Sequence, residues 1–566
     1  MKVVTYLAKF LKSKGIDTVF ELQGGMITRI IDELHRLGEI TIVSVHHEQA
    51  AAMAADAFAR VKNIPGVALA TSGPGATNLI TGIGNCYFDS VPAIFITGQV
   101  NQDELKGDNP SRQIGFQETD IVSIVKPITK ASFAIKSAKD LPMVLQQAYI
   151  LSLEGRPGPV LIDIPMNLQN AECDDFVDIQ QKVNYVSDKG KQIDFIADLR
   201  DTLAESKKPL ILAGRGVRAA GAVQELIRFS EESGIPVVTS LNGIDAIPYH
   251  HPNRVGMIGS YGNRWANYAM GTCDVLLVLG SRIDLRQTGA DIEAFASGKK
   301  IFHVDIEEAE LNNRIKGCFV LQSDVLNFIK GLLEDCLPHG YYKDWFTEIS
   351  SKKEQRLDID ELSGIQGINP NKFIHLLAQL SKQAKAFSTD VGSNQMWVAQ
   401  SLELSENQFF LTSGGMGAMG YALPAAIGAC FALNKAPIVA IAGDGGFQIN
   451  IQELETIRRN NLPVKMVVIN NHCLGMIRQF QDSYFDSNYA ATVWGYSAPD
   501  FVKVANAYGI PSARVEVEEL LVDAIKKMWN NLYEPYLLEV SLDMYTNVYP
   551  KMLFGNSITQ MEPPIF

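Results

Sequence analysis

The sequence lacks any apolar run of the ~18–20 residues that a membrane-spanning helix needs. It is also short of positive charge, because 50 lysines and arginines stand against 63 aspartates and glutamates, a formal net charge of −13. This balance argues against a nucleic acid or an anionic membrane surface as a partner. The first twenty residues show an amphipathic helix pattern and no signal-peptide pattern.

Cysteine and histidine are scarce and unpatterned. The seven cysteines form no CxxC pair, and the nine histidines form no HxxxH pair or similar metal cluster. An odd, scattered set of thiols is typical of a reduced protein, so we expect a cytoplasmic location.

Three regions repeat one rhythm of apolar strand, glycine turn and helix pattern. At 566 residues the chain is too long for one core, and strands that alternate with helices predict parallel sheets covered on both faces. We therefore expect an α/β protein with three doubly wound parallel-sheet domains. Their predicted ranges are 1–165, 190–335 and 369–546, followed by a tail, 547–566.

The segments between these regions are less regular. Two polar stretches, near 168–190 and 338–368, are interpreted as linkers, the second with some helical character. The tail is apolar and proline-rich, which does not suit a solvated segment, so we expect it to pack on the protein surface, where it could cover the active site. The tail side chains expected to pack are Met552, Leu553, Phe554, Ile565 and Phe566.

Two oxygen-bearing side chains follow neighbouring apolar runs in the third region. Run 438–441 ends in a glycine turn around Asp444, and run 464–469 ends at Asn470-Asn471. Because parallel strands present their carboxyl ends at one edge of a sheet, Asp444 and Asn471 are expected to meet there. A carboxylate and an amide suit a divalent cation that holds a diphosphate, and the glycines let backbone N–H groups approach phosphates. The alternative is an ordinary β–α–β unit with an Asp-Gly turn.

Glu48 stands at the end of a predicted strand and opens an alanine-rich helix pattern. Its position has two interpretations. It is either a charge that the helix dipole favours at a helix N-terminus, or a buried acid with a chemical role.

The motifs around these residues resemble those of thiamine diphosphate (ThDP) enzymes, and of the acetolactate (acetohydroxyacid) synthase large subunit in particular. The resemblance covers about residues 3 to 545 and rests on HHEQAAAMAADAFARV, GDG with its closing NN, FELQGGMITRIIDEL, ATSGPGATNLITGI, GRPGPVLIDIP and SGGMGAMGYALPAAIGA. It implies pyrimidine-binding, central and diphosphate-binding domains. It also implies a homodimer or tetramer, in which Glu48 of one chain serves ThDP held mainly by the other.

The same resemblance implies roles for single residues. Asp444, Asn471 and the carbonyl of Cys473 would ligate Mg²⁺. Glu48 would hydrogen-bond N1′ of the aminopyrimidine, and Gly25 and Gln117 would line the site where pyruvate reacts. Further ThDP contacts are implied for Pro74, Asn78, Ser393, Asn394, Gly417, Met419, Gly443, Gly445, Gly446 and Met476.

Met419 would be wedged between the two cofactor rings, a role that suits an unbranched, polarizable side chain. Without its glycine-rich setting, Met419 would be interpreted as a core methionine.

The central region is where members of the resembled family bind FAD. The resemblance implies FAD without net redox chemistry, with Arg156, Arg282 and Asp305 at matching positions, and arginine suits a diphosphate. Surface or interdomain salt bridges are the alternative for these residues. The family's RFDDR motif is changed here, because Ile283 replaces an aromatic residue and Leu285 an acid.

Other departures concern the second substrate. Phe480 stands where the family has a tryptophan that favours a larger 2-ketoacid, and Met166 replaces a lysine. Phe116 is expected to contact substrate as well.

The expected activity is decarboxylation of pyruvate and transfer of its two-carbon unit to a carbonyl acceptor. The alternatives are transfer to a nucleotide-linked ketosugar, a flavin-dependent pyruvate oxidase and an inactive regulatory protein. A small regulatory subunit is a further partner that the sequence leaves open.

Overall fold

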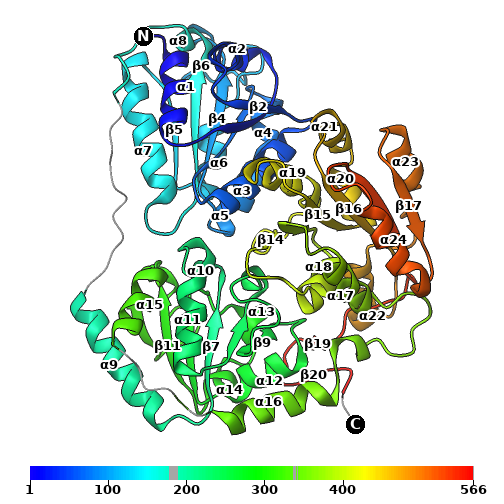
Figure 1. The fold of residues 1–566 in the computed structure, drawn as a ribbon. Helices are drawn as coiled ribbons and strands as arrows, with labels where there is room; N and C mark the ends of the chain where they lie inside the picture. The colour runs from blue at the N-terminus through cyan, green and yellow to red at the C-terminus, as the bar shows by residue number, and fades with distance from the viewer. Residues whose placement is uncertain (178–188, 336–339, 341, 565–566) are drawn as a thin grey trace.

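The computed structural model describes residues 1–177, 189–335, 340 and 342–564. Three six-stranded parallel sheets, each flanked by helices, follow one another along the chain (Figure 1). This architecture confirms the predicted α/β class. No helix in the described ranges is both long enough and apolar enough to cross a membrane.

The first sheet has the strand order β2-β1-β3-β4-β6-β5. Its strands are β1 (Thr18–Leu22), β2 (Thr41–Ser44), β3 (Gly66–Ala70), β4 (Ala93–Gln99), β5 (Ala131–Ala134) and β6 (Pro159–Pro165). Its helices are α1 (Val3–Ser13), α2 (Thr28–Leu37), α3 (Glu48–Lys62), α4 (Pro74–Asn78), α5 (Ile80–Phe88), α6 (Ile121–Val125), α7 (Leu141–Leu153) and α8 (Met166–Gln169).

The second sheet has the order β12-β11-β10-β7-β8-β9. All its strands are parallel, but successive strands are added on opposite sides of the boundary between β7 and β10, so the strand order reverses there. Its strands are β7 (Pro209–Ala213), β8 (Val237–Thr239), β9 (Arg254–Met257), β10 (Val275–Leu279), β11 (Lys300–Asp305) and β12 (Phe319–Gln322). Its helices are α9 (Lys189–Glu205), α10 (Arg215–Ala219), α11 (Val223–Ser233), α12 (Arg264–Thr272), α13 (Leu285–Thr288), α14 (Ile292–Ala296), α15 (Val325–Glu334) and α16 (Lys343–Gln355). Ligands of open α/β sheets bind at such a reversal point.

The third sheet repeats the topology of the first, with the order β14-β13-β15-β16-β18-β17. Its strands are β13 (Ala386–Thr389), β14 (Phe409–Thr412), β15 (Ile438–Gly443), β16 (Val464–Asn470), β17 (Ser512–Val515) and β18 (Tyr536–Ser541). Its helices are α17 (Pro370–Leu380), α18 (Ser393–Ser401), α19 (Ala422–Ala432), α20 (Asp444–Ile449), α21 (Glu453–Arg459), α22 (Gly475–Tyr484), α23 (Phe501–Ala507) and α24 (Leu521–Met528). Strands β15 and β16 pair in parallel, so the residues that follow them lie at one sheet edge, as predicted.

The alanine-rich helix α3 joins the first domain to the third, where it packs on α19 (Figure 1). The contact is close because both helices are built from small residues. A Cβ added to Gly428 would lie 2.0 Å from the carbonyl oxygen of Ala54. The two domains therefore share one hydrophobic core, and the helix that begins with Glu48 is held rigidly within it.

The two irregular stretches differ in part from their interpretation as linkers. Residues 343–355 form α16, whose Trp345 is buried and donates from its indole nitrogen to the carbonyl oxygen of Pro209 at 3.1 Å. This part of the second stretch therefore belongs to the central domain. Much of the first stretch, 178–188, lies outside the described residues.

The tail forms a two-stranded antiparallel hairpin, β19 (Lys551–Met552) and β20 (Met561–Glu562). Met552 packs against the central core together with buried Ile558. The prediction was wrong for Phe554, which is 80% exposed because it lies in the loop of the hairpin. Ile565 and Phe566 lie outside the described residues.

Candidate active site

Three oxygen-bearing groups converge where β15 and β16 end. Asp444 begins α20, and Asn471 and Cys473 follow β16. If its side-chain nitrogen faces them, Asn471 donates to Asp444 Oδ1 at 3.3 Å and to the Cys473 carbonyl oxygen at 2.9 Å. If its side-chain oxygen lies there instead, three oxygens face one another with no donor between them. A divalent cation would stabilise that second arrangement.

Two further polar atoms at this edge make no hydrogen bond with the described residues. Oδ2 of Asp444 and Oγ of Ser393 are both buried without a hydrogen bond. Burial raises the pKa of Asp444 to about 7, since removal from water disfavours its charged form. Buried polar groups are normally satisfied, so these atoms fit a bound cation and a polar ligand. No group of three or more His, Cys, Asp or Glu side chains in the described ranges could hold a metal ion, and this site instead mixes one carboxylate with an amide and a carbonyl.

Glycines at the end of β15 keep this sheet edge free of side chains that would crowd the site. A Cβ on Gly445 would lie 2.6 Å from Leu474 and 3.4 Å from Cε of Met419. A Cβ on Gly443 would lie 3.2 Å from Oδ1 of Asn394. The predicted residues of the diphosphate side thus lie together, and Met419 reaches the glycine turn.

Asp390 is a site residue that the sequence analysis missed. It follows β13, is buried, and accepts hydrogen bonds from the backbone N–H groups of Gly420 and Ala422, both at 2.9 Å. Burial raises its pKa to about 6, although these bonds oppose the shift. Asp390 fixes the glycine-rich loop, defined here as residues 413–420. Its position at the end of a strand was the signal that could have revealed it.

Glu48 lies in the first domain as the first residue of α3, and its side chain is buried. Asn78 Nδ2 donates to Oε2 of Glu48 at 2.9 Å. The second carboxylate oxygen, Oε1, lies beside Gly75, whose added Cβ would be 3.2 Å away. The structure therefore holds the carboxyl group through one oxygen and leaves the other beside a residue without a side chain.

The other residues predicted for the first domain lie in the segments that follow its strands. Gly25 begins a short 3₁₀ helix, and Pro74 begins α4. Gln117 has a left-handed backbone (φ 67°), a conformation that is uncommon outside glycine and frequent at functional sites. A Cβ on Gly73 would lie 3.0 Å from Cβ of Gln117. Phe116 beside it is 79% exposed.

A cavity of about 980 Å³ opens at the reversal point of the central sheet and reaches the third domain. Gly214 and Gly280 let two backbones cross at its base, since a Cβ on Gly214 would lie 2.1 Å from the Gly280 carbonyl oxygen. The predicted residues that line the cavity are Arg156, Arg282, Asp305, Gly417, Met476 and Phe480. Gly25, Glu48 and Gln117 do not line it.

The three predicted flavin residues already have protein partners. Arg156 donates to Oγ of Ser90 at 2.8 Å and to Glu310 at 2.7 Å, so it is an interdomain ion pair as well as a cavity residue. Arg282 lies 3.4 Å from Asp284. Asp305 ends β11, and burial raises its pKa to about 6.

A cavity arginine that the sequence analysis did not single out is Arg215, at the start of α10. Its recorded hydrogen bond is a long one, from Nε to the Asp89 carbonyl oxygen at 3.4 Å.

Phe480 lies on α22 and is 50% exposed, so it does not fill core space. Its ring contacts that of Tyr484, with the ring centres 4.8 Å apart. Met552 and Leu553 of the tail line the same cavity. The tail therefore reaches the cavity into which Phe480 projects.

Three family models match the chain in the order of its domains. The N-terminal TPP-binding domain of thiamine pyrophosphate enzymes matches residues 1–124, their central domain matches 196–332, and their C-terminal TPP-binding domain matches 390–540. With its three parallel sheets and its two sets of site residues, the chain belongs to the thiamine pyrophosphate enzymes.

Full-length relatives narrow this class. The chain is 37% identical to a probable acetolactate synthase large subunit of Methanocaldococcus jannaschii, over all of this chain and 96% of the relative. It is 36% identical to the acetolactate synthase isozyme 2 large subunit of Escherichia coli, over 99% of each chain. It is 38% identical to the acetolactate synthase large subunit of Cyanidium caldarium, over 98% of this chain and 95% of the relative. The protein is therefore a ThDP-dependent carboligase similar to acetolactate synthase large subunits, which confirms the resemblance found in the motifs.

Proposed function

We propose that the protein uses ThDP and Mg²⁺ to decarboxylate pyruvate and transfers the two-carbon hydroxyethyl unit to a carbonyl acceptor, as an acetolactate synthase does. The observation that carries the proposal is the convergence of Asp444, Asn471 and the Cys473 carbonyl beside unpartnered buried oxygens. ThDP, when bound, supplies the nucleophilic carbon and the electron sink for decarboxylation.

The residues of the third domain would hold the charged end of the cofactor. Asp444, Asn471 and Cys473 would ligate Mg²⁺, and Oγ of Ser393 would donate to a diphosphate oxygen. Asn394 and the glycines of residues 443–446 would provide further polar contacts and close backbone approach. A cation here would also offset the burial of the Asp444 carboxylate.

Glu48 would exchange a proton with a ring nitrogen of the cofactor. Because Asn78 holds Oε2, the free oxygen Oε1 is the atom that would carry the proton. Gln117 and Gly25 would orient pyruvate next to this group, and exclusion of water from the buried surroundings would favour loss of carbon dioxide.

FAD is the ligand that we propose for the central cavity, with a structural rather than a redox role. The central sheet has the strand order of dinucleotide-binding folds, and the cavity lies at its reversal point. Arg156 and Arg282 would face the diphosphate, and Asp305 would accept hydrogen bonds from a ribose.

The complete site would form between two chains. Glu48, Gly25 and Gln117 lie apart from the cavity that holds Met476 and Gly417, and both sets carry exposed apolar side chains such as Phe116 and Phe480. A homodimer, or a tetramer made of two dimers, would bring the two sets together. The relatives' description as large subunits supports a regulatory subunit as a further partner. The scattered thiols, six of which the structure describes as free, support a cytoplasmic location.

The test is incubation of the full-length protein with ThDP, Mg²⁺ and pyruvate, with and without 2-ketobutyrate or a nucleotide-linked ketosugar. Products are identified by mass spectrometry, and carbon dioxide release is measured in parallel. Acetolactate is the expected product. A branched sugar as the sole product would show that the acceptor is a ketosugar and not a 2-ketoacid. Reduction of the flavin by pyruvate would indicate an oxidase. Absence of carbon dioxide release would overturn the proposal.

A further inference from the structure

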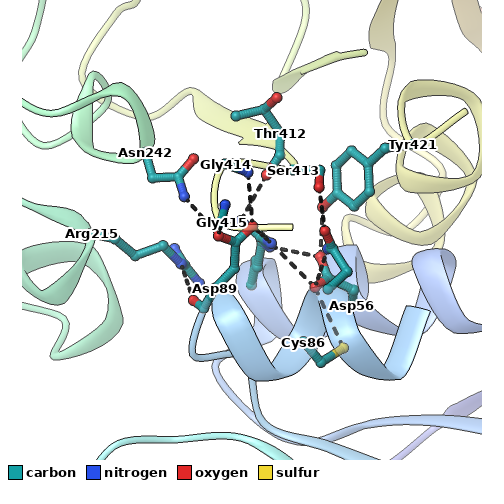
Figure 2. Close-up of polar contacts among 12 residues, drawn as sticks. Asp56, Cys86, Asp89, Arg215, Asn242, Thr412, Ser413, Gly414, Gly415 and Tyr421 are labelled. Carbon is teal, nitrogen blue, oxygen red and sulfur yellow. Dashed lines mark hydrogen bonds and ion pairs between the residues drawn. The ribbon is translucent and has the colours of Figure 1, made fainter. Parts of the chain in front are cut away.

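Asp89 is buried at the point where the three domains meet (Figure 2). It follows α5 of the first domain, and its two carboxylate oxygens accept four hydrogen bonds. Oδ1 accepts from Gly415 N at 2.6 Å and from Asn242 Nδ2 of the central domain at 3.1 Å. Oδ2 accepts from Gly414 N at 3.0 Å and from Arg60 Nη2 at 2.9 Å. One carboxylate thus links all three domains.

The partners of Asp89 in the third domain belong to the glycine-rich loop. The loop approaches too closely for side chains at two positions, because a Cβ on Gly415 would lie 2.9 Å from Oδ1 of Asp89. A Cβ on Gly414 would lie 2.3 Å from Nδ2 of Asn242. Gly417 and Met419, which we assign to the ThDP site, follow directly in the same loop. The position of Asp89 therefore fixes the root of a cofactor-binding loop.

A charged network makes this anchor rigid. Arg60 is buried and forms a two-pronged ion pair with Asp56, at 2.7 and 3.2 Å, in addition to its bond to Asp89. Although burial opposes it, the two carboxylates raise the pKa of Arg60 well above its usual range. Tyr421 donates to Asp56 at 2.6 Å. A buried network of paired charges keeps a single arrangement, because leaving a charged member unpaired is costly.

The same anchor forms part of the wall of the central cavity. Asp89, Asn242, Arg215 and the loop residue Gly414 all line that cavity. Among the described residues, the one hydrogen bond of Arg215 is its long bond to the Asp89 backbone, and burial together with the charge of Arg60 lowers its pKa to about 10. Oδ1 of Asn242 is buried without a hydrogen bond. A ligand with both an anionic group and a hydroxyl donor would satisfy these two groups beside Asp89, because Arg215 donates and Oδ1 of Asn242 accepts.

We propose that Asp89 is a positioning residue that couples the central cavity to the ThDP site. Its hydrogen bonds from Gly414 and Gly415 fix the position of the glycine-rich loop. Its hydrogen bond from Asn242, which lines the cavity, links that position to the ligand bound in the cavity. This inference rests on the proposed function, because it takes FAD and ThDP as the two ligands. Coupling of two binding sites is reciprocal, so each ligand strengthens binding of the other by the same factor.

The test measures binding rather than turnover. ThDP affinity is measured by calorimetry in Mg²⁺ buffer with and without saturating FAD, and FAD affinity by flavin fluorescence with and without ThDP. In the unmodified protein, saturation with either cofactor should raise the affinity for the other at least threefold. In Asp89→Asn, ThDP affinity should fall at least tenfold, FAD affinity without ThDP should change less than threefold, and the mutual effect should vanish.

Two further variants keep the result decisive. Asn242→Ala removes only the link to the central domain, so it should keep ThDP affinity without FAD within twofold and lose the mutual effect. It decides the question if Asp89→Asn does not fold by circular dichroism. The matched control is Asp103→Asn, an exposed aspartate of the same domain, which should behave as the unmodified protein.

The outcomes separate this inference from the proposed function. An unmodified protein that binds both cofactors with no mutual effect overturns the coupling alone, as does an Asn242→Ala variant with unchanged coupling. An unmodified protein that binds no FAD overturns the flavin site and the coupling together, whereas one that binds no ThDP overturns the proposed function itself.

Discussion

Asn78 Nδ2 donates a hydrogen bond to Oε2 of Glu48 at 2.9 Å, although α3 and α4, which carry the two residues, are separated by strand β3. The bond fixes the carboxyl group at the start of α3, and the packing of α3 on α19 fixes the helix itself. The orientation of Glu48 is therefore set by its neighbours before any ligand arrives, as a positioned acid requires.

Glu48→Gln keeps the shape of the side chain and removes its exchangeable proton. We expect pyruvate decarboxylation to fall ~10²–10⁴-fold, the usual effect of losing a positioned acid–base group. Carbon dioxide release gives the rate, and circular dichroism checks the fold. Glu516→Gln, at an exposed glutamate, is the control and should keep full activity. Activity of Glu48→Gln within a factor of two of the unmodified protein would contradict the assignment.

Asp444→Ala removes the one charged side chain that we assign to the cation. Magnesium-dependent ThDP binding should be lost, because an amide and a carbonyl alone bind Mg²⁺ weakly. Calorimetry in the presence and absence of Mg²⁺ measures this loss. Asp523→Ala, at an exposed aspartate of α24, should bind as the unmodified protein does. An Asp444→Ala variant with unchanged ThDP affinity would refute the metal role.

Phe480→Trp enlarges a side chain that projects into the cavity. We expect the product ratio to shift toward the 2-ketobutyrate adduct when pyruvate and 2-ketobutyrate compete as acceptors. Because Phe480 is half exposed, the larger ring should not cost the ~1–3 kcal/mol typical of overpacking a core. Tyr533→Trp is the control, since Tyr533 is 71% exposed and does not line the cavity. An unmodified protein that already strongly prefers 2-ketobutyrate would defeat this prediction.

His375 gives the stability of the protein a pH dependence. Its ring nitrogens lie 2.8 Å from Asp358 and 2.7 Å from Glu403. Burial lowers the pKa of His375, but the two carboxylates outweigh burial and raise it above its usual value. The stabilisation is therefore complete below the unfolded-state pKa of about 6.5 and is lost as the pH rises through the higher folded-state pKa.

The measurement is the unfolding free energy of the unmodified protein and of His375→Gln across this range. The variant should be less stable at pH 6 by about 1.5–3 kcal/mol, the size of a hydrogen bond to a charged group, and the gap should narrow toward pH 9. His35→Gln, at an exposed histidine, should show no such trend. A gap that widens with rising pH would contradict the predicted sign.

The sequence by itself determined the elements and the two motifs of the site. Apolar runs separated by helix patterns predicted three parallel sheets, because that periodicity is local and each strand shows it independently. Since β15 and β16 are consecutive and pair in parallel, the chain order alone brought Asp444 and Asn471 to one edge. Glu48 was likewise placed at the start of its helix by the residues around it.

Only the tertiary structure decided which distant groups meet. Asp89 and Gly415 are 326 residues apart, and neither the charge of Asp89 nor the glycine predicts their hydrogen bond. Arg215 and the exposure of Phe554 escaped the sequence analysis for the same reason, whereas the position of Asp390 at the end of β13 was a signal in the sequence itself. Periodicity records which face of an element is buried, but the partner of a buried polar group depends on how whole domains pack, and that packing is a property of the assembled chain.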